Sequence, residues 1–173
     1  MADFRLALLL VPLLAACVAN AHAQDLSSQR DYSDPAQRDR PIACKPGDIE
    51  IHPGETLGRL FGSAWPVEPA PSKPENYTRA RLIKRGPISW PHGLSPEDSI
   101  DVVAVLVDPN GKPLKAETLC STRMGLGATV RRAVMEGTYT PATLDGRPVT
   151  SVIVLVQRVH AMERARPMNS AGS

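Results

Sequence analysis

Apolar positions in the second half of the chain follow the pattern of a β-hairpin. Residues 100–107 read IDVVAVLV, so a strand there would be apolar on both faces except at Asp101, and such a strand is covered on both sides. The sequence Asp-Pro-Asn-Gly at 108–111 suits a tight turn, because proline presets the first turn position and Asn-Gly accepts positive φ. Residues 113–120 then alternate, and one face carries Leu114, Ala116, Thr118 and Cys120. The pattern predicts two antiparallel strands joined by the turn.

A helical period follows the predicted hairpin. Apolar side chains recur at the spacing of one helix face, at Leu126, Val130, Ala133 and Val134. We therefore expect an amphipathic helix at about 123–136, ended by Gly137. Ser121 or Thr122 precedes it, and either hydroxyl could accept a hydrogen bond from a free amide at the helix start.

The last regular pattern, at residues 150–159, is again apolar on both faces and predicts a third strand. The order strand, strand, helix, strand is typical of an antiparallel sheet with a helix on one face. The sequence therefore predicts an α+β fold, a small β-β-α-β domain. It would have a three-stranded antiparallel sheet with one helix packed on a single face, preceded by an irregular Pro-rich segment.

The first half of the chain is much less regular. Residues 24–41 are polar and charged, which predicts a flexible tether, and residues 42–80 are rich in proline. Within that irregular segment, residues 48–52 alternate as a strand does and residues 56–61 could form a helical turn. Residues 53–61 also resemble the opening of LysM peptidoglycan-binding modules. Trp65-Pro66 and further prolines replace the expected second helix and strand, so a loop-and-turn packing segment is the competing interpretation.

The N-terminus has the features of an export signal. Arg5 precedes an uncharged run, LALLLVPLLAAC, which is shorter than the about 20 apolar residues that a membrane-spanning helix needs. Ala21-His22-Ala23 then supplies small residues where a signal peptidase reads, so residues 1–23 are expected to be a cleaved signal peptide. Leu14-Ala15-Ala16-Cys17 is similar to a lipoprotein lipobox, so lipidation of Cys17 is the open alternative. Either route predicts export to the periplasm, with any membrane attachment through a lipid at Cys17.

Export bears on the oxidation state of the cysteines. By either route Cys17 is no longer a free thiol, which leaves Cys44 and Cys120 in an oxidising compartment, and we expect them to form a disulfide. The histidines beyond the signal have no metal-ligand spacing, so neither a metal nor a cofactor is expected. The net charge of +2 is too small to predict a nucleic-acid partner.

Residues 88–159 resemble the C-terminal domain of TonB. The resemblance is carried by an ordered set of motifs: Trp90-Pro91, residues 99–122, residues 133–137, Tyr139-Thr140-Pro141-Ala142, Gly146-Arg147-Pro148-Val149 and the final apolar strand. It places a TonB C-terminal-like domain at 81–160, followed by a disordered tail at 161–173. The chain departs from TonB in having a signal-like segment instead of a transmembrane anchor, and only a short Pro-rich stretch at 67–75 instead of a long linker. The resemblance thus implies a fold and a mode of protein contact, and leaves energy transduction in doubt.

In that family a receptor peptide adds alongside the last strand. The resemblance therefore implies a partner-binding edge at Ser151, Val152, Val154, Val156 and Arg158. A strand rich in Val and Ile with unpaired backbone groups is also a physical template for strand addition. The expected partner is a protein of the cell envelope, with an outer-membrane receptor peptide and a second copy of this chain among the candidates. Coverage of the edge by the chain's own N-terminal segment is the competing possibility.

Two other function classes compete with protein binding. A cell-envelope structural or peptidoglycan-binding protein is the alternative that the LysM-like fragment supports. An enzyme is not expected, because no nucleophile, base and acid stand in a recognisable motif. Glu97 and Asp98 are adjacent carboxylates, but the sequence around them is that of an ordinary solvated turn.

Overall fold

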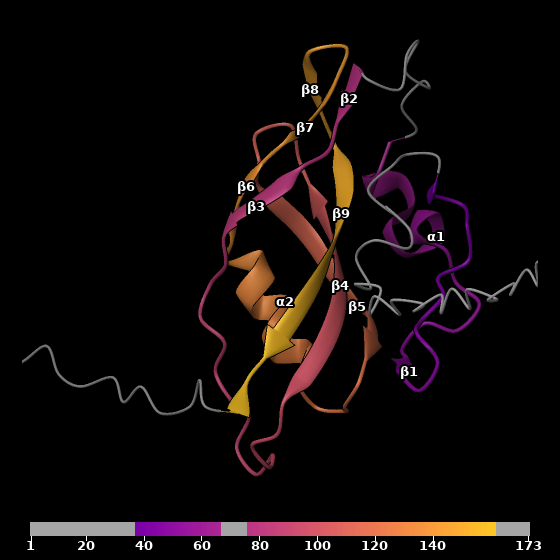
Figure 1. The fold of residues 1–173 in the computed structure, drawn as a ribbon. Helices are drawn as coiled ribbons and strands as arrows, with labels where there is room; N and C mark the ends of the chain where they lie inside the picture. Colours follow the sequence, from indigo (N-terminus) through magenta and orange to yellow (C-terminus); the bar gives the residue numbers. More distant parts are fainter. Residues whose placement is uncertain (1–36, 67–75, 162–173) are drawn as a thin grey trace, which may run out of the picture.

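The computed structural model describes residues 37–66 and 76–161, a mixed α+β fold with mostly antiparallel sheets (Figure 1). The segments before residue 37 and after residue 161 lie outside the described residues, so the interpretations of the signal, of Cys17 and of most of the tether and tail are not addressed by the structure. No helix in the described ranges has the length and apolarity to cross a membrane.

A four-stranded sheet forms the centre of the fold. Its strands are β1 (Ile49–Glu50), β5 (Pro113–Ser121), β4 (Ser99–Val107) and β9 (Ser151–Val159), in the order β1-β5-β4-β9. All three pairings are antiparallel. The three predicted strands are confirmed, with ends that differ by one residue at most. The sheet is nevertheless not three-stranded as expected, because β1 from the Pro-rich segment pairs with β5.

Two smaller sheets were missed by the sequence analysis. One has the order β2-β7-β8, from Tyr77–Thr78, Ala142–Leu144 and Arg147–Val149, and the other pairs β3 (Arg81–Lys84) with β6 (Thr138–Thr140). None of these strands exceeds four residues, which is too short to show a period of two above the background. The β2-β7-β8 sheet lies at the top of the view in Figure 1, at the end of the molecule away from the helix that follows β5.

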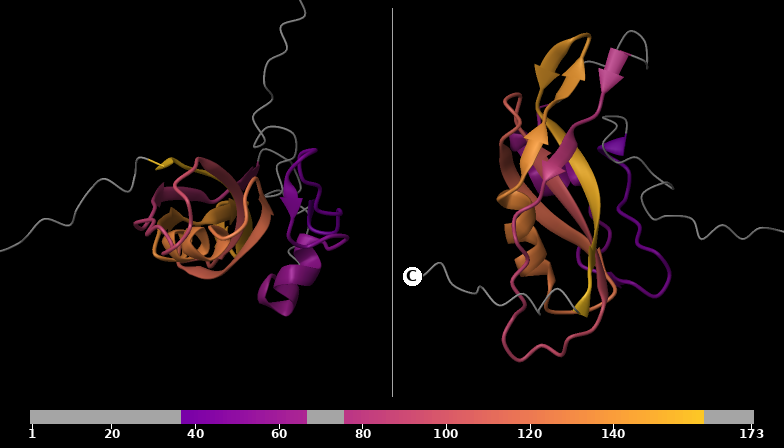
Figure 2. Two further views of the ribbon diagram at one scale, coloured as in Figure 1. Left: turned by 90° about the horizontal axis from the view of Figure 1, so that it is seen from below. Right: turned by 60° about the vertical axis from the view of Figure 1, so that its left-hand side comes forward.

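Each face of the central sheet has its own apolar cluster. Odd-numbered side chains of β4 and β9, such as Val103, Val105 and Ile153, pack with α2 (Gly127–Met135). Even-numbered ones, such as Leu106 and Val152, pack with the N-terminal segment on the opposite face. Figure 2 shows α2 inside the curve of the sheet and the N-terminal segment outside it. The covering of both faces agrees with the apolar character of both strands.

Residues 37–66, here called the N-terminal cap, form the outer layer. The cap contains β1, helix α1 (Leu57–Phe61) and a 3-10 turn at Gly62–Ala64, and Thr56 caps α1 by accepting a hydrogen bond from the amide of Arg59. Arg38 joins its two ends, because its guanidinium donates to the carbonyl oxygens of Gly62 and Trp65 and lies over the Trp65 ring. The predicted disulfide is present and joins Cys44 in the cap to Cys120 in β5.

A β-bulge determines which face Cys120 occupies. The pairing of β4 with β5 shifts between Val102 and Val103, so that Leu119 is the extra residue in β5. Ala116 remains on the α2 face, whereas Leu119 and Cys120 both join the cluster under the cap. The expectation that Cys120 shares a face with Ala116 was therefore wrong, since an inserted residue reverses the alternation beyond it.

The start of α2 also differs from the prediction. The helix begins at Gly127 after Leu126, with no side chain capping it. Thr122 instead accepts a hydrogen bond from the amide of Ile100, and Ser121 bonds to the backbone of Arg123. Both hydroxyls thus secure the end of β5 and not the helix, which starts about one turn later than predicted.

Two turn glycines both have positive φ, but they differ in how closely another part of the chain approaches them. Gly111 and Gly146 have φ of 79° and 78°, but a Cβ on Gly111 would collide with the carbonyl oxygen of Tyr139, whereas a Cβ on Gly146 would meet nothing within 4 Å. We expect Gly146→Ala to lower the free energy of unfolding by about 1 kcal/mol through φ strain alone. Gly111→Ala should cost about 1–3 kcal/mol more, because the hairpin must move away from β6. Equal losses in urea unfolding would show that the close approach is unimportant.

Candidate functional site

The predicted binding residues lie on an edge strand. β9 is the last strand of the central sheet and pairs only with β4 among the described strands, from Ser151 opposite Val107 to Val159 opposite Ser99. The register has no irregularity along its whole length. The structure thus places Ser151, Val152, Val154, Val156 and Arg158 together along one sheet edge.

The hydrogen bonds of Ile100 on β4 show which backbone groups of β9 face outward. Its amide donates to the Thr122 hydroxyl and its carbonyl accepts from the Thr122 amide, both at 3.0 Å, so both groups point toward β5. Ile100 is opposite Arg158, and the two therefore form a non-hydrogen-bonded pair. By alternation along the regular register, the even-numbered residues of β9 direct their amides and carbonyls away from β4. The odd-numbered residues pair with β4.

Three residues in the middle of this edge present unpaired backbone groups. Within the described ranges, no hydrogen bond joins the outward amides and carbonyls of Val152, Val154 or Val156 to another segment. Arg158, at the end of the row, is exposed and has a further interaction. Ser151 pairs with Val107 instead, so its backbone does not face outward, and its buried side chain lies at the start of the edge.

The side chains at the edge are apolar on both faces of the sheet. Val154 packs against the cluster under the cap, and Leu155 packs against the cluster around α2. Both are only half-buried, as is Val156, whereas Val152 and Ile153 are buried. A strand added here would therefore meet apolar surface on each side. The sequence named the even-numbered valines but missed the contribution of Leu155, which needs the two-layer packing to be seen.

The opposite edge of the sheet has a different character. β1 covers only the end of β5, at Cys120 and Ser121. The rest of β5 carries Pro113, Lys115 and Glu117, and Glu117 forms ion pairs with Lys115 at 3.3 Å and with Arg131 at 3.5 Å. Prolines and charges are the usual protection of an edge against strand pairing. β9 has no charge before Arg158, so within the described ranges the β9 edge has less of this protection than the β5 edge.

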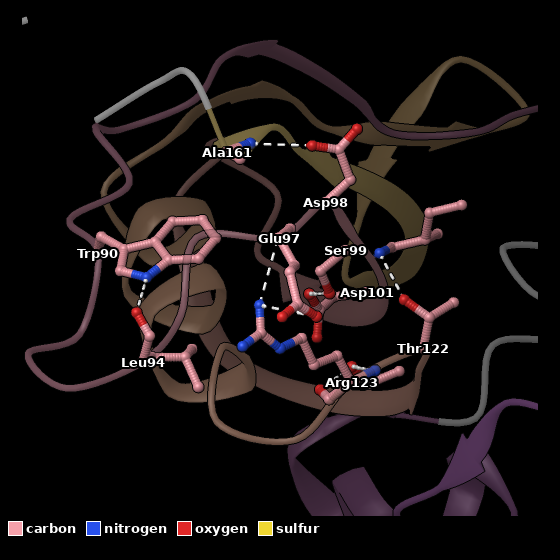
Figure 3. Close-up of polar contacts among 11 residues, drawn as sticks. Trp90, Leu94, Glu97, Asp98, Ser99, Asp101, Thr122, Arg123 and Ala161 are labelled. Carbon is pink, nitrogen blue, oxygen red and sulfur yellow. Dashed lines mark hydrogen bonds and ion pairs between the residues drawn. The ribbon is translucent and has the colours of Figure 1, made fainter. Parts of the chain in front are cut away.

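A polar cluster closes the α2 side of the sheet near the end of β9. Asp101 on β4 is fully buried, where the Ser99 hydroxyl donates to its Oδ2 at 3.1 Å and its Oδ1 has no hydrogen-bond partner. Opposite it in the register, Gln157 accepts a hydrogen bond from Arg85 at 3.1 Å. Burial raises the pKa of Asp101, and the neighbouring side chains of Ser121 and then Ser99 oppose that rise only in part. Figure 3 shows Asp101 beside Ser99, with Glu97 and Arg123 close by.

The loop before β4 holds the two residues that directly follow β9. Asp98 accepts a hydrogen bond from the amide of Ala161 at 2.9 Å (Figure 3). Its carboxylate also lies 3.1 Å from Nδ1 of His160. The amide of Ala161, and then His160, lower the pKa of the exposed Asp98 carboxyl. The turn around Glu97 and Asp98 is thus solvated as predicted, but it also anchors the end of the edge strand, a role that no local pattern indicates.

Asp101 on β4 and Asp108 in the turn that follows β4 should change the free energy of unfolding with pH in opposite directions. Burial raises the pKa of Asp101, so its ionisation costs stability as pH rises. The amides of Lys112 and Asn110 lower the pKa of Asp108, so its ionised form stabilises the turn. From about pH 3 to about pH 7, Asp101→Asn should gain unfolding free energy relative to the unsubstituted protein, and Asp108→Asn should lose it. Urea unfolding at each pH measures both differences in unfolding free energy. If the difference between Asp101→Asn and the unsubstituted protein does not change with pH, burial does not raise the pKa of Asp101.

Neither a metal site nor a similar known protein gives further information about the function. In the part of the chain that the structure describes, no group of three or more His, Cys, Asp or Glu side chains is placed to hold a metal ion. No protein-family model, no curated protein and no solved structure matches this chain. The geometry of the β9 edge is therefore the basis on which a function is assigned.

Proposed function

We propose that the protein is an exported protein-interaction module that binds an extended segment of a partner by adding it as a strand beside β9. The observation that carries the proposal is the row of outward backbone groups at Val152, Val154 and Val156, which are unpaired within the described residues. This stretch of β9 has no proline, and no charge before Arg158. Such an edge is a template for β-strand addition.

The rest of the fold supports this assignment. β4, β5, α2 and β9 follow one another in the order that the resemblance to the TonB C-terminal domain implies. The Cys44–Cys120 disulfide is consistent with an oxidising, exported location, and together with the signal-like N-terminus it supports the periplasm. The partner would then be a protein of the cell envelope, with an outer-membrane receptor peptide as one candidate.

The cap does not occupy the edge that the partner needs. It contributes its strand to β5, at the other side of the sheet, and packs its side chains on the face. The LysM-like residues of the cap form α1, whose Leu57 and Phe61 are buried against that face. That fragment thus has a packing role, which favours protein binding over peptidoglycan binding.

The geometry also sets the expected strength of binding. Three outward residues offer three donors and three acceptors, each hydrogen bond adding about 0.5–1.5 kcal/mol net. That sum is comparable to the cost of association, of about 4 kcal/mol or more. Backbone pairing would therefore fix the orientation of the partner strand, and burial of Val154, Leu155 and Val156 beneath its side chains would supply the remaining affinity.

Proline scanning separates binding from folding on the same strand. Val154→Pro removes an outward amide and should abolish partner capture with the domain still folded. Leu155→Pro removes an amide that pairs with β4 and should unfold the domain. Capture of envelope proteins by each variant, with circular dichroism of the purified chain, measures both effects. Undiminished capture by a folded Val154→Pro variant would rule out this edge as the binding site.

A photocrosslinking residue identifies the occupant of the edge. Placed at position 156, which is half-exposed on β9, it should link the protein to a partner in cells, whereas the exposed position 114 on β5 should not. A link between two copies of this chain would identify a homodimer as the occupant. Equal labelling from both positions would contradict the contrast between the two edges.

A further inference from the structure

The face of the sheet beneath the cap is strongly apolar. Four cap side chains, Ile42, Leu57, Phe61 and Trp65, are buried there against residues of the sheet. The sheet side of this cluster consists of Ala104, Leu106, Leu119, Cys120 and Val152, with Val102 and Val154 partly buried at its margin. Without the cap, this surface would be exposed to water.

Few backbone contacts hold the cap on that surface. β1 pairs only Ile49 and Glu50 with β5, and the amide of Ile51 donates to Leu119 at 3.0 Å. The Lys115 ammonium adds a hydrogen bond of 2.7 Å to the carbonyl of Leu60. The one α helix of the cap has five residues, far fewer than the about 12–15 needed for even marginal stability in isolation. The cap therefore depends on its attachment to the sheet.

The disulfide is placed at the centre of that attachment. Cys120 is itself the β5 residue that pairs with Glu50, and Leu119 beside it accepts the bond from Ile51. Cys120 is buried, whereas Cys44 is partly exposed on the cap side. Cys44 is thus the less buried end of the bond that fastens the cap.

The other face of the sheet is independent of the cap. The cluster around α2 is built from residues between Tyr77 and Val159 and includes no cap residue. The three nine-residue strands of the sheet also pair with one another without the cap. Loss of the cap would therefore remove one layer and leave the other in place.

We propose that the Cys44–Cys120 disulfide is a redox-controlled latch, and that a dithiol reductant opens it and releases the N-terminal cap while the α2 layer stays folded. A thiolate of the reductant attacks Sγ of Cys44, the less buried of the two cysteines, and Cys120 leaves as a thiolate that takes up a proton. The second thiol of the reductant then displaces Cys44, also as a thiol. Two electrons and two protons pass to the protein, and the reductant becomes a disulfide.

Loss of the covalent link changes the balance between the closed and the released cap. The link spans 76 residues of sequence, and the chain-entropy account gives it an effect of about three orders of magnitude on such an equilibrium. The released state exposes Val102, Ala104 and Leu106 on β4, with Val152 and Val154 on β9. The latch thus controls whether this face of the sheet is covered, including the Val152 and Val154 side chains of β9.

Amide exchange with and without dithiothreitol tests the latch. Cap amides that bond within the cap, those of Ile42, Leu60 and Trp65, report on release. Those of Val130 and Glu136 in and after α2 report on the other layer. On reduction we expect cap exchange to rise by about a hundredfold or more, with α2 amides changing by less than about threefold. Unchanged cap exchange would overturn the proposal, and so would an equal rise in both sets.

The double substitution Cys44→Ser with Cys120→Ser provides the matched control. It should exchange like the reduced protein from the start and show no response to dithiothreitol. If the double variant instead keeps a protected cap, or loses the protection of α2 as well, the disulfide is an ordinary structural link and not a latch.

Discussion

The fold depends on one constraint, the burial of β4 on all sides. Its odd-numbered side chains need one apolar layer, its even-numbered side chains need another, and both of its edges pair with strands. α2 supplies the first layer and the N-terminal cap the second (Figure 2). A single helix on one face would leave the residues around Leu106 in water, so the Pro-rich half of the chain is a structural layer.

The patterns that the sequence predicted well are those that repeat over eight or more residues. The three long strands and α2 are of this kind, and the disulfide followed from counting cysteines in an exported chain. The short strands β2, β3, β6, β7 and β8 carry too few residues for a period to be recognised. The bulge at Leu119 escaped detection for a different reason, because it is visible only in the pairing with β4 and reverses the face of Cys120.

The candidate site was predicted only in part for the same physical reason. An apolar run of Val and Ile identifies a strand, but it does not say which amides face outward. That direction becomes visible only from the Ile100–Thr122 hydrogen bonds on the far side of β4, together with the register between β4 and β9. The polar contacts that hold the end of the strand, from Asp98 to Ala161 and from Arg85 to Gln157, join residues more than 60 positions apart and have no local pattern.

The two apolar layers cover both faces of β9 and leave its outer edge open. Residue-resolved amide exchange along β9 in the isolated protein tests this claim most directly. Because alternate amides face β4 and solvent, Ile153, Leu155 and Gln157 should exchange slowly, and Val152, Val154 and Val156 should exchange faster by about a hundredfold or more. Equally slow exchange of both sets would instead show that the outer edge of β9 is already paired and not open.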